Sequence, residues 1–156
     1  MCLYINKEHI KTIKLPFSEK LQYYKSFIAT EDIHVHKLLI KADDYGYYLT
    51  PYRLTKFYFS NGKAILKSKF SLREILEGKI CKGIHSYEHL TQEKLERITS
   101  LCDVSFNGTV IRFKAYEAII PKGTKYFKSV KIDGFTQYVS EKLIVYDNHF
   151  YNVEME

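Results

Sequence analysis

Two pairs of closely spaced histidines are the residues of this chain whose types and spacing most directly suggest chemistry. His34 and His36 are two residues apart, which places them on one face of a strand, and His85 and His89 are four apart, which fits one face of a helix. Imidazole nitrogens are common zinc ligands. Neither pair has the glutamate that directly follows the first histidine of a metalloprotease helix. We therefore expect neither a metal site nor another cofactor.

The stretch CKGIHSYEHL, residues 81–90, adds a thiol to this chemistry. Cys81 and His85 could form a thiolate–imidazolium pair of the kind that nucleophilic enzymes use. Isolated cysteines more often serve packing, and the same stretch has a simple structural interpretation. In that interpretation Gly83 permits a close approach of two backbones, and Ser86 caps a helix that follows. We assign no catalytic residue on this basis.

Aromatic and basic side chains are interleaved in two further segments, YYLTPYRLTKFYF over residues 47–59 and PKGTKYFKSVK over residues 121–131. Aromatic rings stack on nucleobases, while lysine and arginine neutralise phosphates. In the second segment Gly123 allows backbone N–H groups to point toward an anion. The competing interpretation of that segment is a hairpin turn with exposed lysines. The pattern as a whole predicts a nucleotide-binding site formed by Tyr52, Arg53, Tyr58, His85, Tyr87, Arg112, Lys122, Lys125 and Tyr126.

Alternating apolar and polar residues predict that mainly strands position these side chains. The alternation is found over residues 33–40, 57–59, 64–66, 110–117 and 143–146. Asn61 and Gly62 are typical of the tight turn of a hairpin. Residues 147–149 predict a final turn, followed by a short return strand.

Three segments have the three- and four-residue spacing of a helix. The first covers residues 17–30, the second begins after a capping serine, Ser71, and the third covers residues 91–103 with Thr91 as its cap. Together the elements predict an α+β fold. We expect a single domain over residues 1–156, mainly an antiparallel β-sheet, with one or two helices packed against it.

The overall composition limits the class of protein. The chain of 156 residues has a net charge of +6 and a pI near 9.0, so it attracts anions such as nucleotides and nucleic acid. Its apolar runs are too short to span a bilayer, and its charged N-terminus does not resemble a signal peptide. Three cysteines, Cys2, Cys81 and Cys102, show no CxxC spacing and imply no disulfide framework. We therefore expect a cytoplasmic protein without a membrane partner.

Several motifs that together span most of the chain carry a resemblance to known proteins. In order they are MCLYI (residues 1–5), IHVHKLL (33–39), LTPY (49–52), KGIHSYEHL (82–90), EAIIPKGTKYF (117–127) and QYVSEKLIV (137–145). This series is similar to that of a group of uncharacterised small proteins from bacteriophages and gut bacteria. The resemblance implies an accessory protein of a phage or mobile element, located in the cytoplasm of an infected or carrier bacterium. No activity is assigned to the group, so the resemblance transfers no functional residue.

Three functions agree with these observations. The first is a phage protein that sequesters a small anionic nucleotide signal of bacterial anti-phage immunity without catalysis, since phages carry small proteins of this kind. Such a protein can form a homo-oligomer with ligands at the subunit interfaces. The second is an enzyme similar in layout to ADP-ribosyltransferases, with His36, Tyr87 and Glu141 as its site. The third is a nucleic-acid-binding protein that tolerates many sequences and loses affinity steeply with salt.

Overall fold

Antiparallel β-strands dominate a computed structural model of the chain, which describes residues 3–4, 26–42, 47–49, 56–77, 79–88, 90–91, 93–94, 113–130 and 136–153. The strands are β1 (Leu3–Tyr4), β2 (Phe27–Ile28), β3 (Ile33–Ala42), β4 (Tyr47–Leu49), β5 (Lys56–Phe57), β6 (Lys63–Lys67), β7 (Lys79–Ile80), β8 (Ile84–Tyr87), β9 (Phe113–Ile120), β10 (Lys125–Val130), β11 (Thr136–Ser140) and β12 (Lys142–Val153). A short helix, α3 (Leu72–Glu77), lies between β6 and β7. The expected antiparallel sheet is thus confirmed, and very little helix accompanies it in the described residues.

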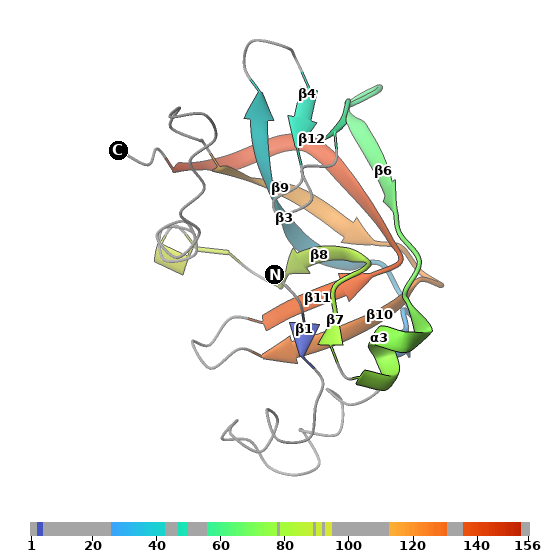
Figure 1. The fold of residues 1–156 in the computed structure, drawn as a ribbon. Helices are drawn as coiled ribbons and strands as arrows, with labels where there is room; N and C mark the ends of the chain where they lie inside the picture. The colour runs from blue at the N-terminus through green and yellow to red at the C-terminus, as the bar shows by residue number, and fades with distance from the viewer. Residues whose placement is uncertain are drawn as a thin grey trace.

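Ten of the strands form one continuous sheet (Figure 1). Its strand order is β2-β10-β11-β8-β3-β9-β12-β6, and β4 pairs with both β3 and β5 beside this path. Figure 1 shows a strong twist, with β6 and β12 toward one end of the sheet and β10 and β11 toward the other. The small β1–β7 pair and α3 lie beside β10 and β11.

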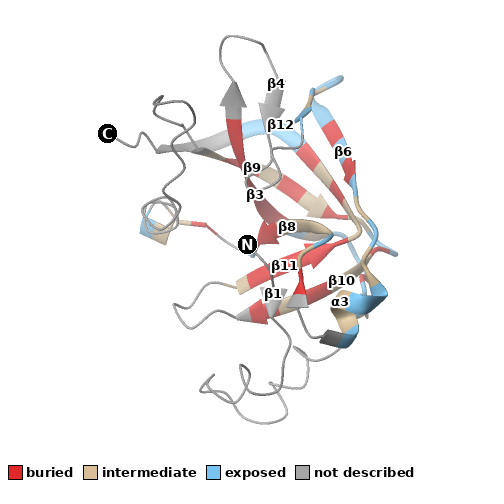
Figure 2. Ribbon diagram, viewed as in Figure 1, coloured by how far each residue is buried: buried red, intermediate tan, exposed pale blue. Residues whose placement is uncertain are grey.

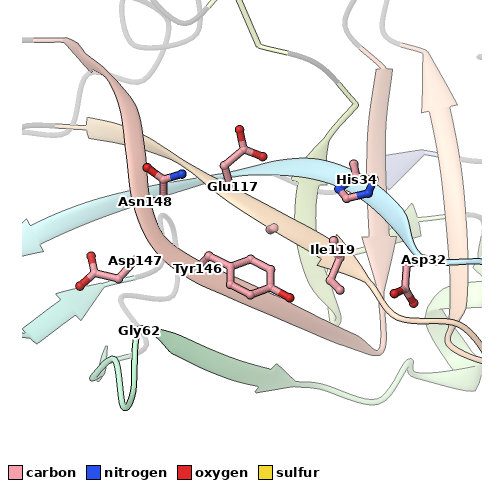
Figure 3. Close-up of a pocket in the computed structure, with 9 residues that line it drawn as sticks. Asp32, His34, Gly62, Glu117, Ile119, Tyr146, Asp147 and Asn148 are labelled. Carbon is pink, nitrogen blue, oxygen red and sulfur yellow. The ribbon is translucent and has the colours of Figure 1, made fainter.

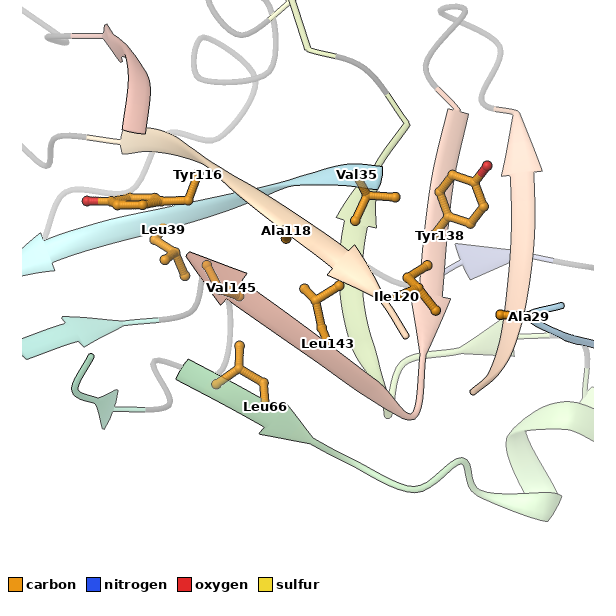
Figure 4. Close-up of a cluster of buried hydrophobic side chains, with 10 residues drawn as sticks. All are labelled: Ala29, Val35, Leu39, Leu66, Tyr116, Ala118, Ile120, Tyr138, Leu143 and Val145. Atoms are coloured by element: carbon orange, nitrogen blue, oxygen red, sulfur yellow. The ribbon is translucent and has the colours of Figure 1, made fainter. Parts of the chain in front are cut away.

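One face of the curved sheet, here called the inner face, holds the larger hydrophobic core. Alternate residues of neighbouring strands point into it, because the registers pair Val35 with Ala118 and Ala118 with Val145. The core residues (Figure 4) are Ala29, Val35, Leu39, Leu66, Tyr116, Ala118, Ile120, Tyr138, Leu143 and Val145. Because β6 and β11 are far apart in the strand order yet both contribute, burial of these side chains stabilises the curvature.

The opposite face, here called the outer face, is covered at one end. Over β10 and β11 a second buried cluster consists of Ile80, Phe127 and Val139, with Phe70 and Ile75 packed against it. Over β6 and β12 the described residues leave the outer face open to solvent (Figure 2). There Ile65 is 51% exposed and Tyr146 is 37% exposed. A ligand can therefore reach the outer face at this second end.

Within residues 81–90 the structure describes one strand, β8, and this strand does not turn directly into a helix. Within this stretch β8 occupies the sheet between β11 and β3. A Cβ atom at Gly83 would lie 2.5 Å from Val139 Cγ1, so this glycine allows a close approach, and its neighbours are side chains and not a second backbone. Ser86 is not a helix cap, because it is fully buried within β8.

The helix caps predicted at Ser71 and Thr91 are confirmed, in contrast to the one predicted at Ser86. At the start of α3, Ser71 Oγ accepts a hydrogen bond from Glu74 N at 3.4 Å. Thr91 Oγ1 accepts one from Lys94 N at 3.2 Å, and residues 93–94 are helical. The rest of that helix, residues 95–103, lies outside the described residues.

Two other predictions of local structure are wrong. The helix expected over residues 17–30 is wrong in its last part, because Phe27 and Ile28 form β2 and pair with β10, while residues 17–25 lie outside the described part. The turn expected over residues 147–149 is replaced by continuous strand. β12 passes through these residues with shifts of register opposite β9. Residues 147–149 therefore belong to a bulged part of the strand and do not reverse the chain.

Cys81 is disulfide-bonded, which corrects the expectation that the chain contains no disulfide. Its partner lies outside the described residues. The spacing of cysteines along the chain indicates common motifs only, whereas pairing depends on which strands meet. Cys81 directly follows β7, whose neighbour is β1, so a long-range contact decides this bond.

Candidate functional site

The described residues form a shallow depression of about 570 Å³ on the outer face, where β3, β9 and β12 run side by side (Figure 3). Its lining residues are Asp32, His34, Gly62, Glu117, Ala118, Ile119, Tyr146, Asp147 and Asn148. A volume of this size suits a small organic molecule. The depression therefore forms the first candidate site.

Strand register brings these residues together from three distant parts of the chain. His34 lies opposite Ile119 in the β3–β9 pair, and Ile119 lies opposite Ile144 in the β9–β12 pair. The tight turn at Gly62 reaches the same region, because Asp147 N donates a hydrogen bond to the carbonyl oxygen of Gly62 at 2.8 Å. The depression is consequently built on paired strands, which hold its residues in fixed positions.

Negative charge is concentrated in the depression. Its three carboxylates belong to Asp32, Glu117 and Asp147. Asp32 accepts a hydrogen bond from the backbone of Lys122, whereas the carboxylate of Glu117 has no partner among the described residues. In Figure 3 the ring of Tyr146 extends from β12 toward Ile119. Carboxylates beside an aromatic ring suit a positively charged ligand better than a phosphate.

None of the residues predicted from the sequence to bind a nucleotide lines this depression. Tyr52, Arg53 and Arg112 lie outside the described residues. Tyr58 is 59% exposed and lies between Phe57 and Phe59, whose side chains pack against the inner-face core. Because alternate residues of an extended chain point in opposite directions, Tyr58 points away from that core.

The turn of residues 121–123 does not offer its backbone N–H groups to a ligand. Each amide donates within the protein: Lys122 N to Asp32 Oδ1 at 2.8 Å, Gly123 N to Ala29 O at 2.7 Å, and Thr124 N to Pro121 O at 3.1 Å. A phosphate here would have to displace these bonds and would meet a carboxylate. Of the two interpretations of this segment, the hairpin turn with an exposed lysine describes its geometry.

The predicted residues of β8 and β10 face opposite sides of the sheet. Tyr126 pairs in register with Ser140, and Ser140 pairs with Ile84, so Tyr126 and Ile84 share the inner face. His85 and Tyr87 alternate with Ile84 and therefore point to the outer face. The structure accordingly does not bring these aromatic side chains onto one surface.

Packing occupies the ring of Tyr126. The ring of Phe27 stacks on it at a centroid distance of 5.7 Å, and the ring of Tyr138 lies at 5.8 Å. Desolvation by burial raises the pKa of the Tyr126 hydroxyl. Lys128 Nζ lies 5.5 Å from the centroid of the Tyr138 ring, so a lysine and two tyrosine rings meet in this group.

His85 belongs to a hydrogen-bonded network on the outer face. Its Nε2 lies 2.9 Å from the carbonyl oxygen of Cys81, and its Nδ1 lies 2.9 Å from Gln137 Nε2. A carbonyl oxygen only accepts, so Nε2 carries the proton and Nδ1 accepts from the amide. The ring is thereby held in place, which supports the structural interpretation of this histidine.

The three residues of the enzyme hypothesis do not form one site. His36 pairs in register with Tyr87, and His36 Nδ1 accepts a hydrogen bond from Leu90 N at 2.9 Å. Glu141 lies four residues beyond the position of β11 that faces Tyr87, or about 13 Å along the strand. Its carboxylate accepts from Phe70 N at 3.0 Å and so serves the backbone.

Lys37 is a buried residue that the sequence analysis does not identify. Its side chain is 5% exposed on the inner face, and burial lowers its pKa to about 8. Nζ donates to the carbonyl oxygen of His85 at 2.7 Å. β3 and β8 share a single register pair, so the amine bridges the point where these strands diverge. A lysine within an alternating strand pattern is the only sequence signal for this role.

Glu117 and Asp147 also escape sequence-based prediction. Glu117 occupies an ordinary polar position of an alternating strand, and Asp147 lies in a segment that resembles a turn.

Among the described residues, no group of three or more His, Cys, Asp or Glu side chains is placed to hold a metal ion. None of the described helical segments has the length and apolar character needed to cross a membrane.

No protein-family model matches the chain, and no match is found among curated proteins or solved structures. The function must therefore be inferred from the residues and their arrangement.

Proposed function

We propose that the protein binds a small organic cation, such as a polyamine or another amine-bearing molecule, in the outer-face depression. The observation that carries this proposal is the concentration of carboxylates from Asp32, Glu117 and Asp147 in one depression of a protein whose net charge is +6. Opposite charge raises the local concentration of a cationic ligand and repels the anions that the rest of the surface attracts.

The side chains suit an amine that carries several donors. Carboxylates accept charge-assisted hydrogen bonds, and the Asn148 side-chain oxygen can accept another. The exposed ring of Tyr146 offers a π face to a cation. A ligand of several ångströms spans the depression, whereas a single metal ion would need ligands that converge on one point.

Binding of spermidine, measured by titration calorimetry at low salt, tests the proposal. We expect Glu117→Gln to weaken spermidine binding about tenfold, because it removes one charge-assisted acceptor. Tyr146→Ala should also weaken it, whereas Tyr146→Phe keeps the ring and should retain affinity. Glu93→Gln removes a carboxylate that does not line the depression and serves as the matched control.

Two results would reject the cation proposal. One is the absence of spermidine binding by the unmodified protein. The other is an equal loss of affinity in Glu117→Gln and Glu93→Gln, which would indicate a general effect of surface charge.

Sequestration of an anionic nucleotide is the second candidate function, and a different surface supports it. Lys128 lies over the ring of Tyr138, next to Tyr126, on the inner face. Binding of AMP or a cyclic dinucleotide that survives Glu117→Gln but is lost in Lys128→Met would favour this candidate. The phage origin and cytoplasmic setting that the resemblance implies are retained in both proposals.

A further inference from the structure

Two buried serine hydroxyls lie on the inner face near Lys37. Ser86 Oγ of β8 and Ser140 Oγ of β11 are buried, and neither has a hydrogen-bond partner among the described residues. Ser86 pairs in register with Tyr138, and Ser140 pairs with Ile84, both of which contact the inner-face core. Residues that pair across antiparallel strands share a face, so both serine side chains point inward.

Lys37 reaches the same place. Its Nζ contacts the carbonyl oxygen of His85, the residue directly before Ser86. An ammonium group has three N–H donors, and one of them is used in this contact. Because Ser86 and Ser140 are diagonal neighbours, about 7–8 Å separates their Cα atoms. Lys37, Ser86 and Ser140 therefore occupy neighbouring positions on three adjacent strands, and the described residues offer no partner to either serine hydroxyl.

No carboxylate of the described residues balances the charge of Lys37. Glu88 follows β8, but its side chain is 51% exposed and its carboxylate lies 3.9 Å from Lys128 Nζ. Opposite Lys37 on β9 lies Tyr116. Burial lowers the pKa of Lys37, and among the described residues no carboxylate opposes this shift. A buried ammonium without a counter-charge is costly, and an anion would offset that cost.

We propose that Lys37, Ser86 and Ser140 form an internal site for a small monovalent anion of the carboxylate class. The ammonium supplies charge, and the hydroxyls supply two neutral donors, which matches the acceptor capacity of a carboxylate. The site lies on the inner face and is independent of the outer-face depression. A negative result for this anion site would therefore not bear on the proposed binding of an organic cation.

Thermal unfolding in formate tests this site. Sodium gluconate, whose anion is much larger than formate, is replaced by sodium formate at constant ionic strength and neutral pH. We expect a saturable rise of Tm in the unmodified protein, because a ligand that binds only the folded state stabilises it. Lys37→Met should abolish the rise, and Ser86→Ala and Ser140→Ala should each weaken apparent formate affinity about tenfold.

The serine variants keep the test decisive if Lys37→Met does not fold. Each removes a hydroxyl that has no hydrogen-bond partner in the described part of the chain, so neither should lower Tm in gluconate. Lys128→Met removes an inner-face lysine that is 24% exposed, and it should leave the formate response unchanged. A response that does not saturate, or that persists at full strength in both serine variants, would overturn the proposal.

Discussion

At the scale of single residues, Lys37 shows how one buried charge sets a local energetic cost. Its amine satisfies a backbone carbonyl that has no strand partner, which is a favourable contact. The same burial removes the ammonium from water and lowers its pKa to about 8. Burial of Lys37 therefore disfavours its charged form in the folded state, so the free energy of unfolding should depend on pH.

The stability contributed by Lys37 should rise with pH between about 8 and 10.5, its folded and ordinary pKa values. Within this window the unfolded chain binds more protons than the folded one, so raising the pH favours folding; below it, both states are protonated. We expect the free energy of unfolding of the unmodified protein to gain up to about 3 kcal/mol relative to Lys37→Met across the window. Urea unfolding of both proteins in gluconate buffer at several pH values measures this difference in the free energy of unfolding.

The difference between the two proteins removes the contributions of other lysines and tyrosines that titrate at high pH. A difference that stays constant from neutral pH to the upper end of the window would show that Lys37 is not desolvated in solution. Addition of formate should move the onset of the gain to higher pH, because a bound anion favours the charged amine.

Gly83 packs against Val139 and Phe70 of the second buried cluster, which covers one end of the outer face. Its φ is +129°, and an added Cβ would lie 2.5 Å from Val139 Cγ1 and 2.8 Å from Phe70 Cε1. We expect Gly83→Ala to lower the free energy of unfolding by about 2–4 kcal/mol through overpacking and backbone strain. Gly123→Ala is the control, because φ is +88° there and no atom lies within 4 Å.

Urea unfolding of the two glycine variants separates packing from backbone strain. Gly123→Ala should cost about 1–2 kcal/mol, the strain of the left-handed conformation alone. Equal losses in both variants would mean that Val139 and Phe70 move aside at little cost.

At the scale of elements, β12 determines the shape of the candidate site. Its register opposite β9 shifts between Val145 and His149 and again between His149 and Tyr151. Bulges of this kind re-aim side chains and often lie beside functional sites. Asp147 and Asn148, which lie within the first shift, both line the depression. A regular strand would alternate these two side chains strictly between the faces.

The disulfide of Cys81 belongs to the same scale. The β1–β7 register pairs Leu3 with Ile80, and continuing it by one residue assigns position 2 to position 81. Residues that face each other in antiparallel strands meet the distance requirement of a disulfide. We therefore expect Cys2 to be the partner, and peptide mapping by mass spectrometry without reduction should recover the corresponding linked peptide.

Cys2→Ser should abolish that bond and lower the free energy of unfolding by about 2–4 kcal/mol, because a crosslink that closes a long loop restricts the unfolded chain. Cys102→Ser provides the matched control and should leave the bond intact. Recovery of a Cys81 peptide linked to Cys102 would contradict the assignment.

At the scale of the whole molecule, the two faces of the sheet have different chemistry. The inner face is apolar with a buried lysine, whereas the accessible end of the outer face presents carboxylates. The net charge of +6 describes neither environment. Charge on the surface as a whole governs long-range attraction, while binding at a site depends on the few groups that line it.

The free edge of the sheet also has a defined character. β6 is the last strand in the order, and its pattern places the exposed Ile65 between two exposed lysines, Lys63 and Lys67. In an antiparallel pairing of two copies of this edge, the lysines would oppose each other. Lysines at an edge strand hinder such association, so the charge pattern disfavours pairing of two copies along β6.

The sequence by itself determined the local structure of many segments. Alternation over residues 33–40 and the Asn61–Gly62 dipeptide are physical preferences of neighbouring residues, and β3 and the hairpin follow from them. The close packing at Gly83 also agrees with its residue type, because glycine adopts a positive φ readily and has no Cβ atom to meet its neighbours.

Only the tertiary structure decided which side chains meet. The amide of Lys122 is occupied by Asp32, 90 residues away in the chain, so a turn that resembles a phosphate cradle offers no donor. The carboxylates of the depression and the donors around Lys37 likewise come from strands distant in sequence. The physical reason is that local preferences act over a few residues, whereas strand register is set by burial of the whole sheet.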